Sequence, residues 1–200
     1  MPLIPSGTLD IESFLGMNKY IITILGKDQP GIIAAVSKVL FENDFNIEDV
    51  RQTILQTEFS GIFVVFGPEK VDSMKLQTYI RSATEPLNLD CHVKILDPGP
   101  LQWTSSATES FVISTRGPDC KGLVAQITTV LANHQVNVTQ LHAVFRGGSA
   151  PEDNVMVYEV DIPTTIDTNH LRQELRAKAD QLNLEINIQH KSIFESINRI

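Results

Sequence analysis

The sequence has few of the residues that mark disulfide frameworks, metal clusters or membrane spans. Its 200 residues include two cysteines, Cys91 and Cys120, with no C-x-x-C pattern, and its five histidines never pair at metal-ligand spacing. No run of about 18 apolar residues could span a bilayer, and the N-terminus lacks the order of a signal peptide. We therefore expect a cytoplasmic protein with reduced thiols, no metal site, no cofactor and no membrane contact.

Positive charge is also scarce. The chain has 16 Lys and Arg against 24 Asp and Glu, which gives a formal net charge of -8 and opposes attraction to nucleic acid. No carboxylate pair or nucleophile elbow stands out, so we expect no enzyme activity. If the protein controls a gene, we expect it to act through another protein and without direct contact to nucleic acid.

The sequence contains an internal repeat. A shift of 91 residues places Gly26 on Gly117, Asp28 on Asp119, Gly31 on Gly122 and Asn46 on Asn137. The motif LNLD (87–90) recurs as LNLE (182–185) at a shift of 95, which predicts a four-residue insertion within RGGSAPEDN (146–154). The repeat predicts an extension (1–17), a first domain (18–97), a linker (98–108) and a second domain with a C-terminal helix (109–200).

Hydrophobic periodicity changes in the same order within each copy. In the first copy it predicts a strand at 20–25, a helix at 32–40, strands at 47–57 and 62–66 around a turn at 58–61, a helix at 76–87 and a strand at 89–95. This βαββαβ order predicts an α+β fold of two tandem ferredoxin-like domains with antiparallel sheets. Residues 191–200 form an amphipathic helix that we expect to fold back on the protein.

A loop of the form G-x-D-x-x-G joins the first strand to the first helix in both copies. It matches neither a P-loop nor a dinucleotide-binding loop. One interpretation is structural: Asp28 and Asp119 cap the helices, Pro30 lies in a first helical turn, and the second glycine allows a tight turn. The other adds a ligand, because a helix N-terminus suits a carboxylate and a nearby Asp or Asn oxygen suits an ammonium. Together these groups describe a free amino acid.

Two segments carry a family resemblance. YIITILGKDQPGIIAAVSKVLFENDFNIEDV (20–50) and its weaker copy FVISTRGPDCKGLVAQITTVLANHQVNVTQL (111–141) resemble the opening of ACT domains. ACT domains are small regulatory modules that bind amino acids and related metabolites, commonly at domain interfaces. The tandem pair, with no segment left for a catalytic domain, is similar to the glycine cleavage system transcriptional repressor family. The resemblance covers roughly residues 18 to 200.

The resemblance also implies a set of ligand-binding residues. Asn46 and Asn137, which start the strand after the helix, are expected to lie close to the loop, although Asn is also common where a turn needs left-handed backbone. The second copy departs from the family pattern because Cys120 and Lys121 replace the Gln29-Pro30 pair. The implied residues are Gly26, Asp28, Pro30, Gly31 and Asn46 in the first copy and Gly117, Asp119, Gly122 and Asn137 in the second.

By this resemblance the chain is a non-catalytic regulator that binds glycine or a related small amino acid. It would control a protein partner, such as a transcriptional activator, and form a homo-oligomer. The alternative is a protein–protein interaction module that works without a ligand and whose loops are structural only. Replacing Asp28 and Asp119 would distinguish the two, and which copy binds is left open.

Overall fold

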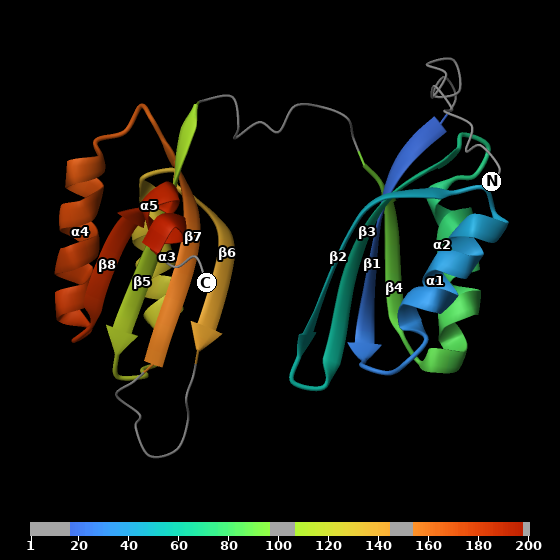
Figure 1. The fold of residues 1–200 in the computed structure, drawn as a ribbon, viewed down its shortest axis with the longest axis horizontal. Helices are drawn as coiled ribbons and strands as arrows, with labels where there is room; N and C mark the ends of the chain where they lie inside the picture. The colour runs from blue at the N-terminus through green and yellow to red at the C-terminus, as the bar shows by residue number, and fades with distance from the viewer. Residues whose placement is uncertain (1–16, 97–106, 145–153, 198–200) are drawn as a thin grey trace, which may run out of the picture. The chain divides into compact units, whose positions relative to one another are not determined.

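The computed structural model describes residues 17–96, 107–144 and 154–197. The chain divides into two compact units, Met1–Gly99 and Pro100–Ile200 (Figure 1). Most of the predicted N-terminal extension, most of the linker, and all but the last residue of the predicted insertion lie outside the described residues. Each unit is therefore considered by itself.

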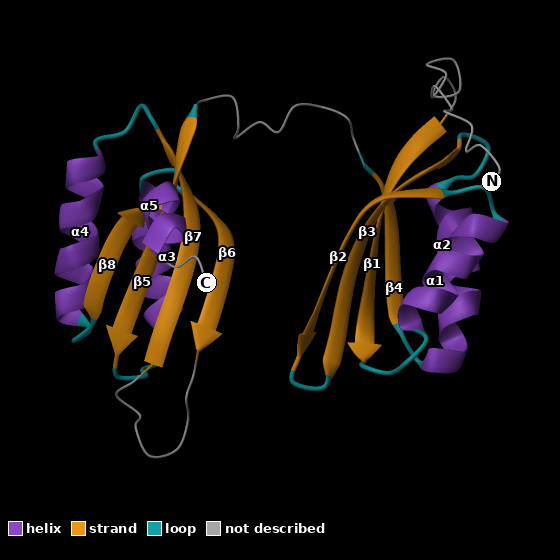
Figure 2. Cartoon of the chain, viewed as in Figure 1, coloured by secondary structure: helices purple, strands orange, loops and turns teal. Residues whose placement is uncertain are grey.

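The first unit contains one four-stranded antiparallel sheet in the strand order β2-β3-β1-β4. Two helices pack against one face of this sheet (Figure 2). The elements follow the predicted βαββαβ order: β1 (Met17–Lys27), α1 (Ile32–Glu42), β2 (Asn46–Leu55), β3 (Glu58–Pro68), α2 (Ser73–Thr84), a single 3₁₀ turn η2 (Glu85–Leu87) and β4 (Asp90–Ile95).

The second unit repeats this arrangement with the strand order β6-β7-β5-β8. The predicted fold, two tandem ferredoxin-like α+β domains, is confirmed. Its elements are β5 (Thr108–Gly117), α3 (Leu123–Asn133), β6 (Asn137–Val144), β7 (Asn154–Pro163), α4 (Thr168–Gln181), β8 (Glu185–His190) and α5 (Lys191–Ile197).

Each unit buries its own core between the sheet and the two helices. In α1 the buried residues Ile32, Val36 and Leu40 recur every four positions, so one helical stripe faces the sheet. In β1 the buried residues alternate with more exposed ones, as a strand with one covered face requires. The largest fully buried side chains include Tyr20, Phe63 and Ile80 in the first unit and Tyr158, Ile127 and Leu171 in the second.

The hairpin of the first unit corrects one prediction. Residues 58–61 do not form a turn, because Glu58 already pairs with Leu55 and begins β3. The turn consists of Gln56 and Thr57, with Gln56 in left-handed backbone (φ 58°), which suits the right-handed twist of a two-residue hairpin.

The predicted position of the insertion is confirmed. In the first unit Thr53 pairs with Ser60, and in the second Val144 pairs with Val155, so the four additional residues lie between β6 and β7.

The C-terminal helix α5 folds back on the second unit, as its amphipathic pattern predicts. It contacts β5 and β8, and in Figure 1 it crosses in front of the sheet while α3 lies behind it. Lys191 Nζ lies 2.8 Å from Glu159 Oε2 on β7. Within the described residues no helix is both long and apolar enough to span a bilayer.

One buried hydrogen bond gives a test of the first core. The hydroxyl of Tyr20, a fully buried residue of β1, donates to the backbone oxygen of Val71 just before α2. We expect Tyr20→Phe to destabilise the protein by about 1–3 kcal/mol, because the carbonyl is left buried without a donor. Urea unfolding followed by circular dichroism measures this change. Tyr79→Phe is the control, since the Tyr79 hydroxyl has no hydrogen bond among the described residues; equal effects of the two changes would contradict the prediction.

Candidate functional site

The turn from the first strand into the first helix has the same geometry in both domains. Helix α1 begins after Gly31, whose φ is 101°, and α3 begins after Gly122, whose φ is 84°. Left-handed backbone of this kind favours glycine. Neither helix has a side-chain cap, so the prediction that Asp28 and Asp119 cap the helices is wrong. The left-handed glycine itself occupies the cap position and leaves each aspartate in the loop.

Pro30 also departs from its predicted place. It lies two residues before the first residue of α1 and so is not part of the first helical turn.

The first glycine of each loop lies where an added Cβ would be crowded, and at Gly117 the crowding atom belongs to the backbone. A Cβ on Gly26 would lie 2.7 Å from Leu89 Cδ2, and one on Gly117 would lie 2.7 Å from the backbone oxygen of Asn183. Both contacts are with the turn that precedes the last strand of the domain. These contacts account for Gly26 and Gly117 without a ligand.

The two predicted asparagines lie far from the loops of their own domains. Asn46 and Lys19 both pair with Phe66, whereas Gly26 is seven residues further along β1. At about 3.3 Å per residue the separation along the sheet is roughly 23 Å. The same register separates Asn137 from its loop, because the helix between the two strands carries the chain back to the opposite end of the sheet. The expected proximity is wrong within each domain.

The turn interpretation of these asparagines is also wrong. Left-handed backbone in these connections falls on Asp44 (φ 62°) and Gln135 (φ 57°), two residues before each asparagine. Asn46 and Asn137 instead begin the edge strands β2 and β6.

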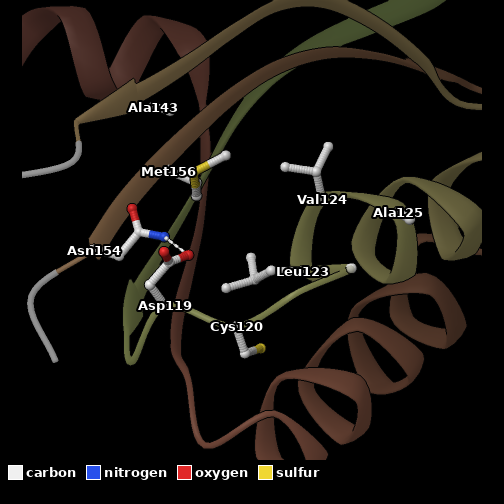
Figure 3. A pocket seen from close by; sticks show the side chains of 9 residues that line it. Asp119, Cys120, Leu123, Val124, Ala125, Ala143, Asn154 and Met156 are labelled. Carbon is white, nitrogen blue, oxygen red and sulfur yellow. Dashed lines mark hydrogen bonds between the residues drawn. The ribbon is translucent and has the colours of Figure 1, made fainter. Parts of the chain in front are cut away.

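The loop of the second domain borders a pocket of about 590 Å³ (Figure 3). Asp119 Oδ1 accepts a hydrogen bond from Asn154 Nδ2 at 3.3 Å across this pocket wall. The structure thus brings the predicted residues Asp119 and Gly122 together with Asn154, which the repeat pattern alone did not single out. The pocket is lined by the loop, the first turn of α3 and the adjoining ends of β6 and β7, through Asp119, Cys120, Gly122, Leu123, Val124, Ala125, Ala143, Asn154 and Met156.

Asn154 is the unusual member of this set. Its side chain lines the pocket although the residue is only 7% exposed, and its Oδ1 has no hydrogen-bond partner among the described residues. A buried amide oxygen without a donor costs about 1–3 kcal/mol, and native proteins keep few such groups. A ligand that donates an N–H or O–H at this point would remove that cost.

The first domain has an aromatic ring at the corresponding position. Phe59 pairs with Gly26 as Asn154 pairs with Gly117. Phe59 is 2% exposed, and a Cβ on Gly61 would lie 2.8 Å from Phe59 Cζ, so the ring lies over the glycine. The two domains share a backbone but present different surfaces behind the loop.

The difference continues along the same face of the sheet. Thr115 and Tyr158 are buried in the second domain, where the first has Ile24 and Phe63. Neither hydroxyl has a hydrogen-bond partner of ordinary geometry among the described residues. Burial raises the pKa of Tyr158, and the nearby Thr115 hydroxyl opposes that rise. Polar groups buried beside the pocket are thus specific to the second domain.

The loop of the first domain is held by its own hydrogen bonds. The backbone N–H of Asp28 donates to the Thr57 oxygen at 2.8 Å, and Gln29 Nε2 donates to the Leu87 oxygen at 2.8 Å. These bonds tie the loop to the β2–β3 turn and to η2, so it is fixed without a ligand.

The fold and the loop geometry agree with a known family. A family model described as the ACT domain matches residues 18–94 and 109–189, which contain both βαββαβ units. The chain belongs to the ACT domain family. In related regulators ACT domains are regulatory modules that bind amino acids.

Among the relatives of this ACT protein are short sequences of about one domain. A UPF0237 protein of Methanopyrus kandleri is 37% identical over 79 residues, which cover 39% of this chain and 88% of that protein. A UPF0237 protein of Streptococcus pneumoniae is 42% identical over 77 residues, which cover 38% of this chain and 83% of that protein.

Two solved structures share the tandem arrangement of this ACT protein. An unknown protein from Galdieria sulphuraria has a TM-score of 0.72 at 20% identity, covering 87% of this chain and 98% of that one. A protein assigned provisionally as a glycine cleavage system transcriptional repressor has a TM-score of 0.65 at 19% identity, and the match covers 86% of this chain and 96% of that one. At these identities the likeness shows the fold.

The packing of Gly117 provides a test of the loop geometry. We expect Gly117→Ala to destabilise the protein by about 1–3 kcal/mol, because the added methyl meets backbone that cannot rotate away. The shift of the urea midpoint measures this effect. Lys121→Ala, an exposed change in the same loop, is the control and should stay within about 0.5 kcal/mol. A parent-like midpoint for Gly117→Ala would show that this contact does not fix the loop.

Proposed function

We propose that the protein is a non-catalytic regulator whose second ACT domain binds a small amino acid in the pocket beside Asp119. The observation that carries this proposal is the buried Asn154 amide, which lines the pocket with its oxygen unpartnered. The first domain has Phe59 at that place, so the polar group is not a requirement of the fold.

The pocket offers a partner to each part of an amino acid. The Asp119 carboxylate and the Asn154 oxygen suit an ammonium group, which carries positive charge and three donors. The uncapped N–H groups at the start of α3 suit a carboxylate, because the positive end of the helix dipole lies there. Leu123, Val124 and Met156 give apolar walls that accept a short aliphatic side chain. Glycine and its close relatives are the proposed ligands.

Regulation would follow from a difference in ligand affinity between two states of the protein. A ligand shifts an equilibrium only if it binds one state more tightly, and the coupling is reciprocal. We propose that amino-acid binding changes contact with a protein partner that controls transcription. The acidic net charge of -8 supports a protein partner over direct contact with DNA.

The first domain favours the second candidate function, a ligand-independent interaction module. Its loop is held by Asp28 and Gln29 hydrogen bonds, and the Phe59 ring lies where the second domain has its polar pocket wall. We therefore assign amino-acid sensing to the second domain and a structural or interaction role to the first.

Thermal unfolding in the presence of each of the twenty amino acids tests this assignment. A ligand that binds only the native state stabilises it by roughly 2.7 kcal/mol at about 100 times its dissociation constant. We expect one small amino acid to raise the midpoint, and Asp119→Asn or Asn154→Leu to abolish the rise. Asn154→Leu keeps the approximate size of the side chain and removes its polar atoms, whereas a Phe at this position would meet Met156, which stands where the first domain has Gly61.

Asp28→Asn is the matched control in the first loop and should retain the response. A response lost in Asp28→Asn but kept in Asp119→Asn would move the site to the first domain. No response to any amino acid at millimolar concentration would favour the interaction module for both domains.

A further inference from the structure

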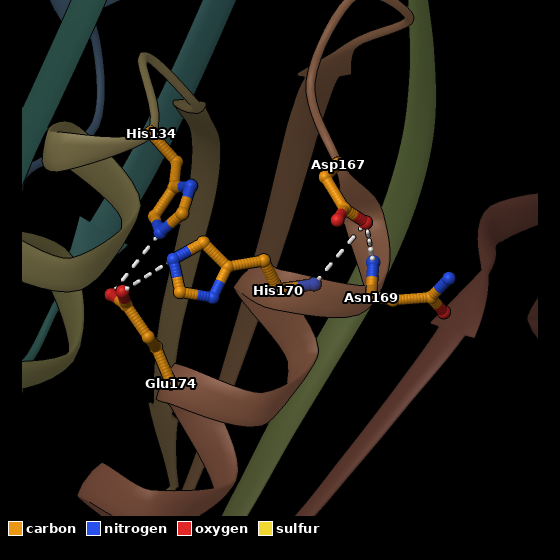
Figure 4. Close-up of polar contacts among 5 residues, drawn as sticks. All are labelled: His134, Asp167, Asn169, His170 and Glu174. Atoms are coloured by element: carbon orange, nitrogen blue, oxygen red, sulfur yellow. Dashed lines mark hydrogen bonds and ion pairs between the residues drawn. The ribbon is translucent and has the colours of Figure 1, made fainter.

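Three side chains of metal-ligand type converge between α3 and α4 (Figure 4). His134 Nε2 lies 3.1 Å from Glu174 Oε2, and His170 Nε2 lies 3.1 Å from Glu174 Oε1. One ligand atom from each residue can be chosen so that all three lie within 4.8 Å of one another. Each imidazole therefore directs its Nε2 toward the same carboxylate.

These separations are close to those of a metal site. Two ligand atoms that each lie about 2.1 Å from a tetrahedral ion are about 3.4 Å apart. To admit an ion, the two His–Glu distances need to grow by a few tenths of an ångström, and the separation of the two imidazole nitrogens, which lies within 4.8 Å, needs to shorten by at most about 1.4 Å. In the tautomer that carries its proton on Nε2, each imidazole donates to the carboxylate. On binding, each imidazole would carry its proton on Nδ1 and offer the Nε2 lone pair, so neutral histidines can bind without net proton loss.

The fold positions each ligand from a defined element. His134 is the residue that ends α3, and it precedes the left-handed Gln135. His170 lies in the first turn of α4, where Asp167 Oδ1 accepts the backbone N–H groups of Asn169 and His170. Glu174 follows one turn later on the same face of α4. Because α3 and α4 pack together, the end of one helix meets the start of the other.

The first domain shows that the fold does not require these ligands. Asn43 ends α1 as His134 ends α3, and Asp72 caps α2 as Asp167 caps α4. Counted from those caps, Lys75 and Tyr79 correspond to His170 and Glu174. The Lys75 ammonium lies 5.9 Å from the centre of the Tyr79 ring, and Asn43 Nδ2 donates to the Val39 oxygen.

The cluster is accessible and electrostatically suited to a cation. The His170 and Glu174 side chains are 59% and 41% exposed, whereas His134 is 16% exposed and fixed against the helix pair. The C-terminal end of α3 carries partial negative charge, and the Asp167 carboxylate offsets the positive end of α4. An ion can therefore enter from solvent and keep a water molecule as a further ligand.

We propose that the second ACT domain binds a zinc-class divalent ion through His134 Nε2, His170 Nε2 and the Glu174 carboxylate. Two imidazoles and one carboxylate with an open position form a ligand set used for zinc, and nickel, cobalt and copper share a preference for imidazole. The bound ion would clamp the end of α3 to the start of α4. The sequence alone shows no metal-ligand spacing because these histidines lie on different helices and are 36 residues apart.

Isothermal titration of the full chain, without an affinity tag and treated with chelator, tests this proposal with zinc chloride. We expect one ion per chain and at least a tenfold loss of affinity in His134→Asn and in His170→Lys. Both changes introduce residues that the first domain has at the equivalent positions, so loss of the fold is not expected. Glu174→Gln, which keeps the size of the side chain, should weaken binding as well.

His142→Asn is the control, since this histidine is exposed and lies outside the cluster. Cys120→Ser controls for the exposed thiol. Both should bind zinc like the parent protein. Parent-like affinity in His134→Asn and His170→Lys would overturn the proposal, as would loss of binding in Cys120→Ser. Cobalt provides a second readout: its spectrum should lack a thiolate charge-transfer band, and the presence of that band would place the metal elsewhere.

Discussion

Each domain depends on the turn that its two loop glycines make between the first strand and the first helix. Gly26 and Gly117 let the end of that strand pack against the turn before the last strand, where a side chain would collide. Gly31 and Gly122 then use left-handed backbone to start the helix over the core. Because a glycine occupies the cap position, the helix N-terminus keeps unpaired N–H groups. The geometry that closes the core thus also leaves N–H groups of the kind that suit an anion.

The two domains use this shared backbone differently. In the second domain Asn154, Thr115 and Tyr158 place polar atoms on the buried face of the sheet near the loop. The first domain has apolar residues at all three positions, and its loop is held by internal hydrogen bonds. Buried polar groups destabilise a fold unless they are paired, so their restriction to one copy is better explained by function than by folding. Because the domain is duplicated, one copy can contain these destabilising polar groups while the other has apolar residues at the same three positions.

Local sequence patterns were sufficient for the fold but only partly for the site. The repeat and the change from helical to alternating periodicity identified both βαββαβ units. They could do so because the spacing of apolar residues within about ten positions shows which face of an element is buried. The pattern could not show that glycine would replace Asp28 and Asp119 as the helix cap, since backbone φ is decided by the whole turn. It also misplaced Asn46, because α1 returns the chain to the opposite end of the sheet.

Asn154 and the His134 cluster needed the tertiary structure for a different reason. Asn154 faces Asp119 across 35 residues, and His134 meets Glu174 across 40. These pairs join separate elements, and the signal for each lies in the comparison between the two copies. The second domain has Asn154 where the first has Phe59, and it has the histidines of the proposed metal site where the first has Asn43 and Lys75.

The proposed pocket lies at the start of α3 and the His134 cluster at its end, about 16 Å apart along an 11-residue helix. A helix of that length moves as a rigid element, so a displacement at one end reaches the other. If the amino acid and the ion favour the same position of α3, each must strengthen the binding of the other by the same factor.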